Sequence, residues 1–346
     1  MKLSVRPANL DADRDVLIDL MLRYLTPRSD GRRFDWLYRQ NPDGQAQLWV
    51  LTDIVRGTVV GSGGIVPRRM YVGGQERLGC VLVDFWIHPQ YRSLGPALQL
   101  QRACLAGIQD GPYELYYDFP KQNMVAVYRR LGVEPSRCMV RLTKLLSLER
   151  KMASVGKLPF LGRSLIAGAN FIINFRDVRR GNLPESTIYA QNEACGEEFS
   201  QLAREIHSEY GMCVARTSSY LNWRFRSHFH HHYEMLTARR NGSLLGYILF
   251  LQEGEMATIV DLFGVEDAGV RSNLIFAALE ILRKRGAFSV NAPGLSTHAQ
   301  TAFFRKLGFY ARETQPVVIS ATRRAHDTKA EFEAQNILLM DGDRDS

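Results

Sequence analysis

The stretch Cys80–Leu100, CVLVDFWIHPQYRSLGPALQL, restricts the fold of this 346-residue chain more than any other segment. It starts as a run of β-branched and aromatic residues, is interrupted by a His-Pro pair, and continues as an apolar-periodic segment after Pro96. This pattern predicts a strand, a tight loop and a helix. Gly95 and Ala97 are small enough for backbone N–H groups to approach a ligand, and Pro96 suits a first helical turn. Because a helix start has unpaired N–H groups, we expect an anion to bind here.

The loop itself consists of Arg92, Ser93, Leu94, Gly95, Pro96 and Ala97, which form the pattern R-x-x-G-x-A. Both glycine-rich nucleotide patterns, G-x-x-x-x-G-K-[ST] and G-x-G-x-x-G, are absent from it. The loop resembles the pyrophosphate loop of the GNAT family of acyl-coenzyme A transferases, Gln/Arg-x-x-Gly-x-Gly/Ala between a strand and a long helix. The family also has a helix that ends in Tyr-x-x-x-Gly-Phe, and here Tyr128 and Gly132 follow with Val133 in place of Phe. Taken alone, the loop could also be an ordinary strand-to-helix turn.

Local patterns predict a matching order of elements: strand, helix, three strands, helix, strand, helix, strand. The predicted segments are a strand at 3–7, a helix at 13–24, a polar loop at 28–33, strands at 48–52 and 59–66 with another before 72–74, a helix at 96–108, a strand at 115–119 and the helix of Tyr128. The fold class that the GNAT resemblance implies is α/β (α+β), with a mixed, mostly antiparallel central sheet flanked by helices.

A repeat relates the second part of the chain to the first. The aromatic segment 34–39 matches 221–226, and Val-Asp-Phe around Asp84 matches Val-Asp-Leu around Asp261. Tyr128-Arg-Arg-Leu-Gly likewise matches Phe304-Arg-Lys-Leu-Gly. The agreement in order and spacing predicts a duplicated domain, and the whole chain resembles tandem GNAT proteins of the mycothiol synthase-like arrangement. We therefore expect an N-terminal catalytic GNAT domain at 1–145, a basic apolar connecting segment at 146–183 and a C-terminal degenerate GNAT domain at 184–346.

The second copy differs from the first where the chemistry of a transferase would lie. After Asp261 it has no R-x-x-G-x-A pattern, and Glu266 and Asp267 occupy the corresponding loop. Carboxylates there would repel a pyrophosphate. Phe304 also provides no hydroxyl where the first copy has Tyr128. We therefore expect one coenzyme A site per chain, in the first copy.

Length, cysteine use and charge limit the class of protein. A chain of this length favours two domains, and five cysteines without a C-x-x-C pair indicate neither a disulfide framework nor a zinc site. With no apolar leader visible at the start, we expect a cytoplasmic protein. Segment 141–181 has nine basic and two acidic residues, so the net charge of +8 is concentrated there and does not form a uniform nucleic-acid surface. That segment is either a connecting helix or a basic surface for anionic lipid or acyl carrier protein.

Acyl transfer from a thioester to an amine requires an acid, a base and groups that hold the donor. The resemblance implies that Tyr128 is the general acid, with a buried structural tyrosine as the alternative. Asp84 and Asp118 each interrupt an apolar strand, so either could accept the amine proton, although the recurrence of Asp84 as Asp261 favours a structural role. His88 is a further candidate base. The remaining cofactor-binding candidates are Phe85, Trp86 and Ile87, through their backbones, and Asn123.

These features predict a GNAT-type N-acyltransferase that moves an acyl group, acetyl first of all, from coenzyme A to a primary amine of a small molecule. The expected partners are acyl-coenzyme A and that amine, without nucleic acid or metal, in a monomer or dimer. Four neighbouring histidines at 228 and 230–232 have no carboxylate or cysteine at ligand spacing, which favours a polar loop over a metal site. The alternatives are an inactive GNAT-fold binding protein and a transferase that depends on an acyl carrier protein or an aminoacyl-tRNA.

Overall fold

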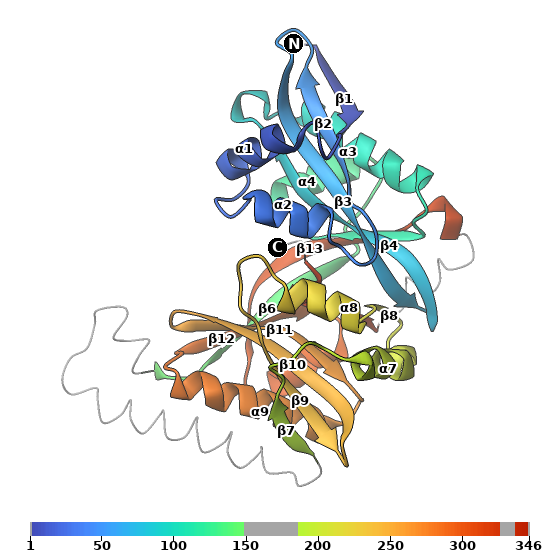
Figure 1. The fold of residues 1–346 in the computed structure, drawn as a ribbon. Coiled ribbons are helices and arrows are strands. Elements are labelled where there is room, and N and C mark those ends of the chain that lie inside the picture. Colours follow the sequence, from blue (N-terminus) through green and yellow to red (C-terminus); the bar gives the residue numbers. More distant parts are fainter. Residues whose placement is uncertain (1, 149–185, 326–335, 345–346) are drawn as a thin grey trace, which may run out of the picture.

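The computed structural model describes residues 2–148, 186–325 and 336–344, and Figure 1 shows two similar halves joined through one long sheet. The sheet has 14 strands, and twelve of them follow the order β1-β2-β3-β4-β5-β13-β6-β12-β11-β10-β9-β7. Two short strands lie off this path, with β8 pairing both β3 and β14. The expected class, a mixed and mostly antiparallel sheet flanked by helices, is confirmed.

The elements of the first half follow the predicted order. They are β1 (Leu3–Pro7), α1 (Arg14–Tyr24), α2 (Gly31–Tyr38), β2 (Gln47–Asp53), β3 (Thr58–Val72), β4 (Gln75–Ile87), the 3-10 turn η1 (Pro89–Tyr91), α3 (Leu94–Asp110), β5 (Leu115–Asp118), α4 (Gln122–Arg130) and β6 (Arg137–Leu145). Two predictions were wrong in detail. The polar loop expected at 28–33 ends early, because the Asp30 side chain accepts a hydrogen bond from the N–H of Arg33 and starts α2. The strands predicted at 59–66 and before 72 are one continuous strand, β3.

The second half repeats this arrangement. Its elements are β7 (Thr187–Ala190), α7 (Glu197–Ile206), η3 (His207–Glu209), β8 (Met212–Val214), α8 (Ser218–Leu221), η4 (Asn222–Arg226), β9 (Glu234–Arg240), β10 (Ser243–Glu253), β11 (Met256–Gly264), α9 (Ala268–Lys284), β12 (Ser289–Leu295), α10 (Ala299–Lys306), β13 (Tyr310–Ala321), η5 (Arg323–Ala325), β14 (Ile337–Leu338) and η6 (Asp341–Asp343). The apolar run 337–340 contributes the short strand β14.

Strands β6 and β13 connect the two halves by pairing across them. Strand β6 follows the Tyr128 helix in sequence, yet it lies between β12 and β13. Strand β13 in turn extends from β6 to β5, where its last residues pair with the end of the first-half sheet. The two strands cross the junction between the halves in Figure 1. Hydrogen bonding is therefore continuous from one half to the other.

The sheet of the first half separates two hydrophobic cores, and helices cover each of them. One core lies between the sheet and helices α3 and α4 and includes Leu100, Cys104 and Tyr128. The other lies on the opposite face, below α1 and α2, and is continuous with the core of the second half. None of the helices that the structure describes has the length and apolar character needed to cross a membrane. Most of the proposed connecting segment 146–183, including its possible lipid or carrier-protein surface, lies outside the described residues.

A reciprocal tryptophan pair joins the halves at the segments that the sequence repeat relates. Trp36 and Trp223 stack with ring centroids 4.8 Å apart. The Nε1–H of each ring donates a 2.9 Å hydrogen bond to the backbone carbonyl of the other residue. Both side chains are buried. The matching aromatic segments are therefore the contact through which the two copies pack together.

Candidate active site

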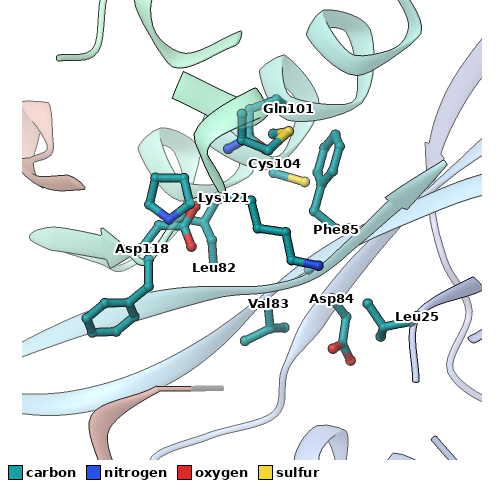
Figure 2. Close-up of a pocket in the computed structure, with 14 residues that line it drawn as sticks. Leu25, Leu82, Val83, Asp84, Phe85, Gln101, Cys104, Asp118 and Lys121 are labelled. Atoms are coloured by element: carbon teal, nitrogen blue, oxygen red, sulfur yellow. The ribbon is translucent and has the colours of Figure 1, made fainter. Parts of the chain in front are cut away.

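A cavity opens in the first half where two parallel strands diverge. Strands β4 and β5 pair only from Gly79 opposite Leu115 to Val81 opposite Tyr117. Beyond that point lies a cavity of about 150 Å³, lined by β3, β4, β5, α3, the start of α4 and Leu25 (Figure 2). Most of its wall is apolar. A ligand that enters between the diverging strands would reach both the β4 backbone and the polar groups of β5 and α3.

A bulge in β4 shapes the cavity beside Asp84. The register with β3 shifts between Ser62 and Gly64, so that Gly63 alone lies opposite two residues, Asp84 and Phe85. Asp84 has a φ of 52°, in the left-handed region that residues with a side chain rarely adopt. Phe85 lines the cavity. The bulge interrupts the alternation of the strand, so the side chains of Val83 and Asp84 lie on the same side of β4 and Phe85 lies on the other (Figure 2).

The carboxylate of Asp84 belongs to a buried ion pair. Both of its oxygens accept hydrogen bonds from Arg33, at 2.7 and 2.8 Å, and the Tyr38 hydroxyl donates to it as well. Burial, and then the Asp84 charge, raise the pKa of Tyr38 well above its usual range. Figure 2 shows the carboxylate on the opposite side of β4 from Gln101 and Cys104. This geometry favours the structural alternative for Asp84 over the role of general base.

Asp118 and Tyr128 form a hydrogen-bonded pair at the cavity wall. Asp118 ends β5 and lines the cavity, and its Oδ2 accepts a 2.5 Å hydrogen bond from the Tyr128 hydroxyl. The Nε2 of Gln101 donates to the same hydroxyl at 3.0 Å. Tyr128 is completely buried, and burial followed by the Asp118 charge raises its pKa well above the usual range. The hydroxyl therefore keeps its proton at neutral pH and lies behind Asp118 and Gln101, which face the cavity.

The predicted anion loop forms an exposed helix start. Ser93 is the N-cap of α3 and makes no side-chain cap hydrogen bond. The N–H groups of Leu94 and Gly95 thus belong to a first helical turn without intrahelical partners, while Pro96 has no N–H. Gly95 is exposed, and a Cβ placed on it would meet no atom within 4 Å. The loop has the room that close approach of a phosphate requires.

The other predicted donor contacts are in β4 and α4. The N–H of His88 donates a hydrogen bond to the carbonyl of Val60 in β3. Because the N–H and C=O groups of successive residues in a strand point to opposite edges, those of Ile87 point to the other edge of β4, beyond the point where its pairing with β5 ends. Arg92 Nε donates to the Ile87 carbonyl at 2.8 Å, which places the Arg92 side chain beside this edge. Trp86 is buried on the other face, stacked on Tyr24. Asn123 is exposed on α4 and is not part of the cavity wall.

The second half has the same divergence of strands but different residues in it. Strand β11 pairs with β12 only from Met256 to Thr258, and the register places Ala292 where the first half has Asp118. The apolar Phe304 stands where the first half has Tyr128. The gap is lined by Leu338, Leu339 and Met340 of the chain's own C-terminal segment, and Met340 bridges to Gly294 of β12.

The helix starts of the two halves also differ. The Asp267 carboxylate accepts hydrogen bonds from the N–H groups of Gly269 and Val270 at 2.7 and 3.1 Å, so it occupies the start of α9. The Ser93 side chain leaves the start of α3 open. An anion would meet a carboxylate in the second half and free N–H groups in the first.

The histidine-rich loop packs against the tryptophan pair. The ring centroids of His228 and Trp36 are 4.7 Å apart. Burial lowers the pKa of His228 to about 2. His231 contacts Arg28 and Glu253. Within the described residues, no group of three or more His, Cys, Asp or Glu side chains is arranged to hold a metal ion.

Three residues of the site were not among those predicted from the sequence: Arg33, Gln101 and Lys121. Arg33 was assigned to a polar loop, although Asp30 three residues earlier was an available N-cap signal. Gln101 interrupts the buried face of α3, and a polar residue on an apolar helix face was the signal that could have identified it. Lys121 precedes α4 without any pattern that separates it from a surface lysine.

Comparisons with known proteins agree with this fold. Solved structures of a probable N-acyltransferase from Enterococcus faecalis V583 and a GCN5-related N-acetyltransferase from Anabaena variabilis ATCC 29413 each have a TM-score of 0.66. They are 13% and 14% identical to this chain, cover 93% and 92% of it, and are each covered over 72% of their own length. Saccharomyces cerevisiae N-myristoyltransferase with bound myristoyl-CoA has a TM-score of 0.57 at 13% identity, over 92% of this chain and 78% of its own.

The likeness defines the class to which the architecture belongs. No protein-family model and no curated protein matches the sequence. At identities this low, the structures show a shared fold, and that fold is the GNAT fold that the sequence pattern predicted. Coverage of more than nine-tenths of this chain means that the likeness extends over both halves.

Proposed function

We propose that this chain is an acyltransferase that moves an acyl group, with acetyl the first to be tested, from coenzyme A to a primary amine of a small molecule. The observation that carries the proposal is the cavity between β4 and β5, which has Asp118 in its wall and the hydroxyl of Tyr128 hydrogen-bonded to it from behind. The GNAT fold and the exposed start of α3 support acyl-coenzyme A as the donor. The same features in the second half are replaced, so the proposal concerns the first half alone.

The donor would bind across the start of α3 and the free edge of β4. The N–H groups of Leu94 and Gly95 would hold the pyrophosphate, since a helix N-terminus favours negative charge. The peptide groups of Ile87 face the gap and would hydrogen bond to the amide-containing arm of coenzyme A. The thioester would then lie in the cavity near Phe85, with water excluded by the apolar wall.

The amine would attack the thioester carbonyl beside Asp118. A carbon–nitrogen bond forms and the carbon–sulfur bond breaks, while Asp118 takes the proton that the nitrogen releases. The Asp118 and Tyr128 pair holds this proton and returns it to the departing thiolate. The Tyr128 hydroxyl donates a hydrogen bond to Asp118 and accepts one from Gln101. These two hydrogen bonds fix the position of the Asp118 and Tyr128 pair. Burial raises the pKa of the Cys104 thiol at the same wall, which disfavours a cysteine nucleophile.

The test replaces Asp118 by asparagine and follows release of the coenzyme A thiol with acetyl-coenzyme A and a mixture of primary amines. We expect kcat to fall about 10² to 10⁴-fold, since this is the usual contribution of a general base. Donor binding, measured by titration calorimetry, should remain. The matched control is Asp110→Asn, because Asp110 is an exposed carboxylate at the end of α3. Equal turnover of Asp118→Asn and Asp110→Asn would contradict the proposal.

A further inference from the structure

The charged side chains that line the cavity indicate which chemical groups the acceptor substrate would carry. The residues that line it include three with charged side chains, Asp84, Asp118 and Lys121. The Asp84 carboxylate is held by both terminal nitrogens of Arg33, so its charge is already matched. Asp118 accepts a hydrogen bond from the Tyr128 hydroxyl, and Lys121 is the cation among the residues that line the cavity. The cavity thus presents one carboxylate and one ammonium group within an otherwise mostly apolar wall.

Lys121 lies in the cavity wall at the start of α4, where its side chain does not stabilise the helix. It is the N-cap residue of α4 and makes no side-chain cap hydrogen bond. A cation at this end of a helix is disfavoured by the helix dipole, and Ser, Thr, Asp or Asn would stabilise the position better. Within the described part of the chain, Lys121 Nζ has no ion-pair partner. Helix stability therefore does not explain a lysine at this position.

The direction of the lysine side chain separates its charge from that of Asp118. Figure 2 shows Lys121 extending over β4, with Nζ pointing away from the Asp118 carboxylate. The two groups would contact different ends of one ligand rather than neutralise each other. Leu25, Leu82, Phe119 and Met124 form apolar wall around them. A ligand that matches this wall has an amine for Asp118, an anionic group for Lys121 and an apolar body.

We propose that the acceptor amine carries a carboxylate and has the chemistry of an apolar α-amino acid, with Lys121 as the residue that selects the carboxylate. This inference rests on the proposed acyl transfer, because Asp118 must receive the amine. The ammonium group of Lys121 pairs with the acceptor carboxylate and leaves the amine directed at Asp118. An amine without the carboxylate loses this contact and binds more weakly.

The expected size of the effect follows from the exposure of Lys121. A hydrogen bond between charged groups is stronger than one between neutral groups when it is shielded from water. Lys121 is exposed, so solvent and salt weaken its pair. We therefore expect about a tenfold preference in kcat/KM for the amino acid over the matching amine, which corresponds to about 1.4 kcal/mol.

The experiment compares acceptors that differ only in the anionic group, with acetyl-coenzyme A as donor and thiol release as the signal. L-Leucine, L-leucinamide and 3-methylbutylamine form one such set, and L-phenylalanine with its amide and phenethylamine forms a second. Wild-type protein should prefer the amino acid in each set. Lys121→Met should raise KM for the amino acids about tenfold with kcat little changed, and leave the amines unaffected. Lys121→Arg should retain the preference, and Lys121→Glu should reverse it in favour of the amides and amines.

The outcomes separate this inference from the function on which it rests. Equal turnover of amino acids and amines, or a Lys121→Met variant that weakens both alike, would overturn the inference and leave the acyltransferase standing. A Lys121→Met variant whose KM rises for acetyl-coenzyme A instead would assign Lys121 to the donor and also overturn it. Absence of both donor binding and turnover with every acceptor would overturn the proposed function itself.

Discussion

The two halves of this protein place different groups at the same point of one scaffold. In each half a strand diverges from its parallel neighbour after three paired residues, β4 from β5 and β11 from β12. The first half leaves the gap as a cavity with Asp118 in its wall. The second half has Ala292 at that position and lines the gap with its own C-terminal segment. The divergence is thus a property of the fold, and its use as a site depends on a few side chains.

A second comparison shows what both halves retain. Each has an arginine, an aspartate and a tyrosine in contact: Arg33, Asp84 and Tyr38 in the first, and Arg216, Asp261 and Tyr247 in the second. Only the aspartate recurs at an equivalent position of the repeat, since Tyr220 and Phe225 stand where the first half has Arg33 and Tyr38, and the second half surrounds Asp261 with an arginine and a tyrosine from other positions. A feature present in both copies is best explained by the fold, and one present in a single copy by the site.

The largest expected effect tests whether the shared aspartates are structural. Asp84→Asn leaves Arg33 buried without its carboxylate partner, so we expect the free energy of unfolding to fall by about 3 to 5 kcal/mol. Asp261→Asn should cost less, because Arg216 also pairs with Asp343 at 2.8 Å. Urea unfolding of both variants measures the difference. If Asp84→Asn were as stable as wild type but inactive, Asp84 would be a catalytic residue instead.

An intermediate effect tests the polar pair that only the first half has. Tyr128→Phe removes the hydroxyl that donates to Asp118, and we expect kcat to fall about 10 to 10²-fold, the value of one hydrogen bond to a charged group. The pH below which activity is lost should rise, because a donor to the ionised carboxylate favours that form. The control is Tyr117→Phe, whose hydroxyl donates to the backbone of Asp343. An unchanged pH profile in Tyr128→Phe would make this tyrosine a packing residue.

The smallest effect concerns the two helix starts. Asp267→Ala removes the carboxylate that caps α9 and should lower the free energy of unfolding by about 1 kcal/mol. Ser93→Ala removes no cap hydrogen bond and should change it by about 0.5 kcal/mol or less. Thermal unfolding of the two variants side by side provides the comparison. Equal losses would mean that the start of α3 is not as open as the structure describes.

Much of the fold could be predicted because its signals are local. The strand, loop and helix of Cys80–Leu100 follow from apolar periodicity and from the residues that start a helix, and they appear as β4, η1 and α3. The duplication was visible as a repeated order of motifs. Asp118 and Tyr128 were also singled out from the sequence, the first as a carboxylate in an apolar strand and the second from the family motif, and the structure places their side chains in contact.

The remaining features depend on contacts between residues far apart in the chain. Asp84 was recognised as unusual, but its partner Arg33 is 51 residues away and was assigned to a loop. The position of β6 beside β12 and β13 could not be predicted, because an apolar strand does not reveal which of two similar sheets it will join. Lys121 has no sequence signal at all, since its importance comes from the cavity beside it.

The reciprocal contact of Trp36 and Trp223 has a consequence for how the two halves find each other. Each ring makes the same bond to the other's backbone, which is the geometry of a contact related by two-fold rotation, as in a homodimer of identical subunits. Here one polypeptide supplies both sides, so association is intramolecular and does not depend on protein concentration. Dilution, which dissociates a dimer of separate subunits, leaves this interface intact. A covalently joined pair can also let one copy specialise, because the other no longer has to be identical to it.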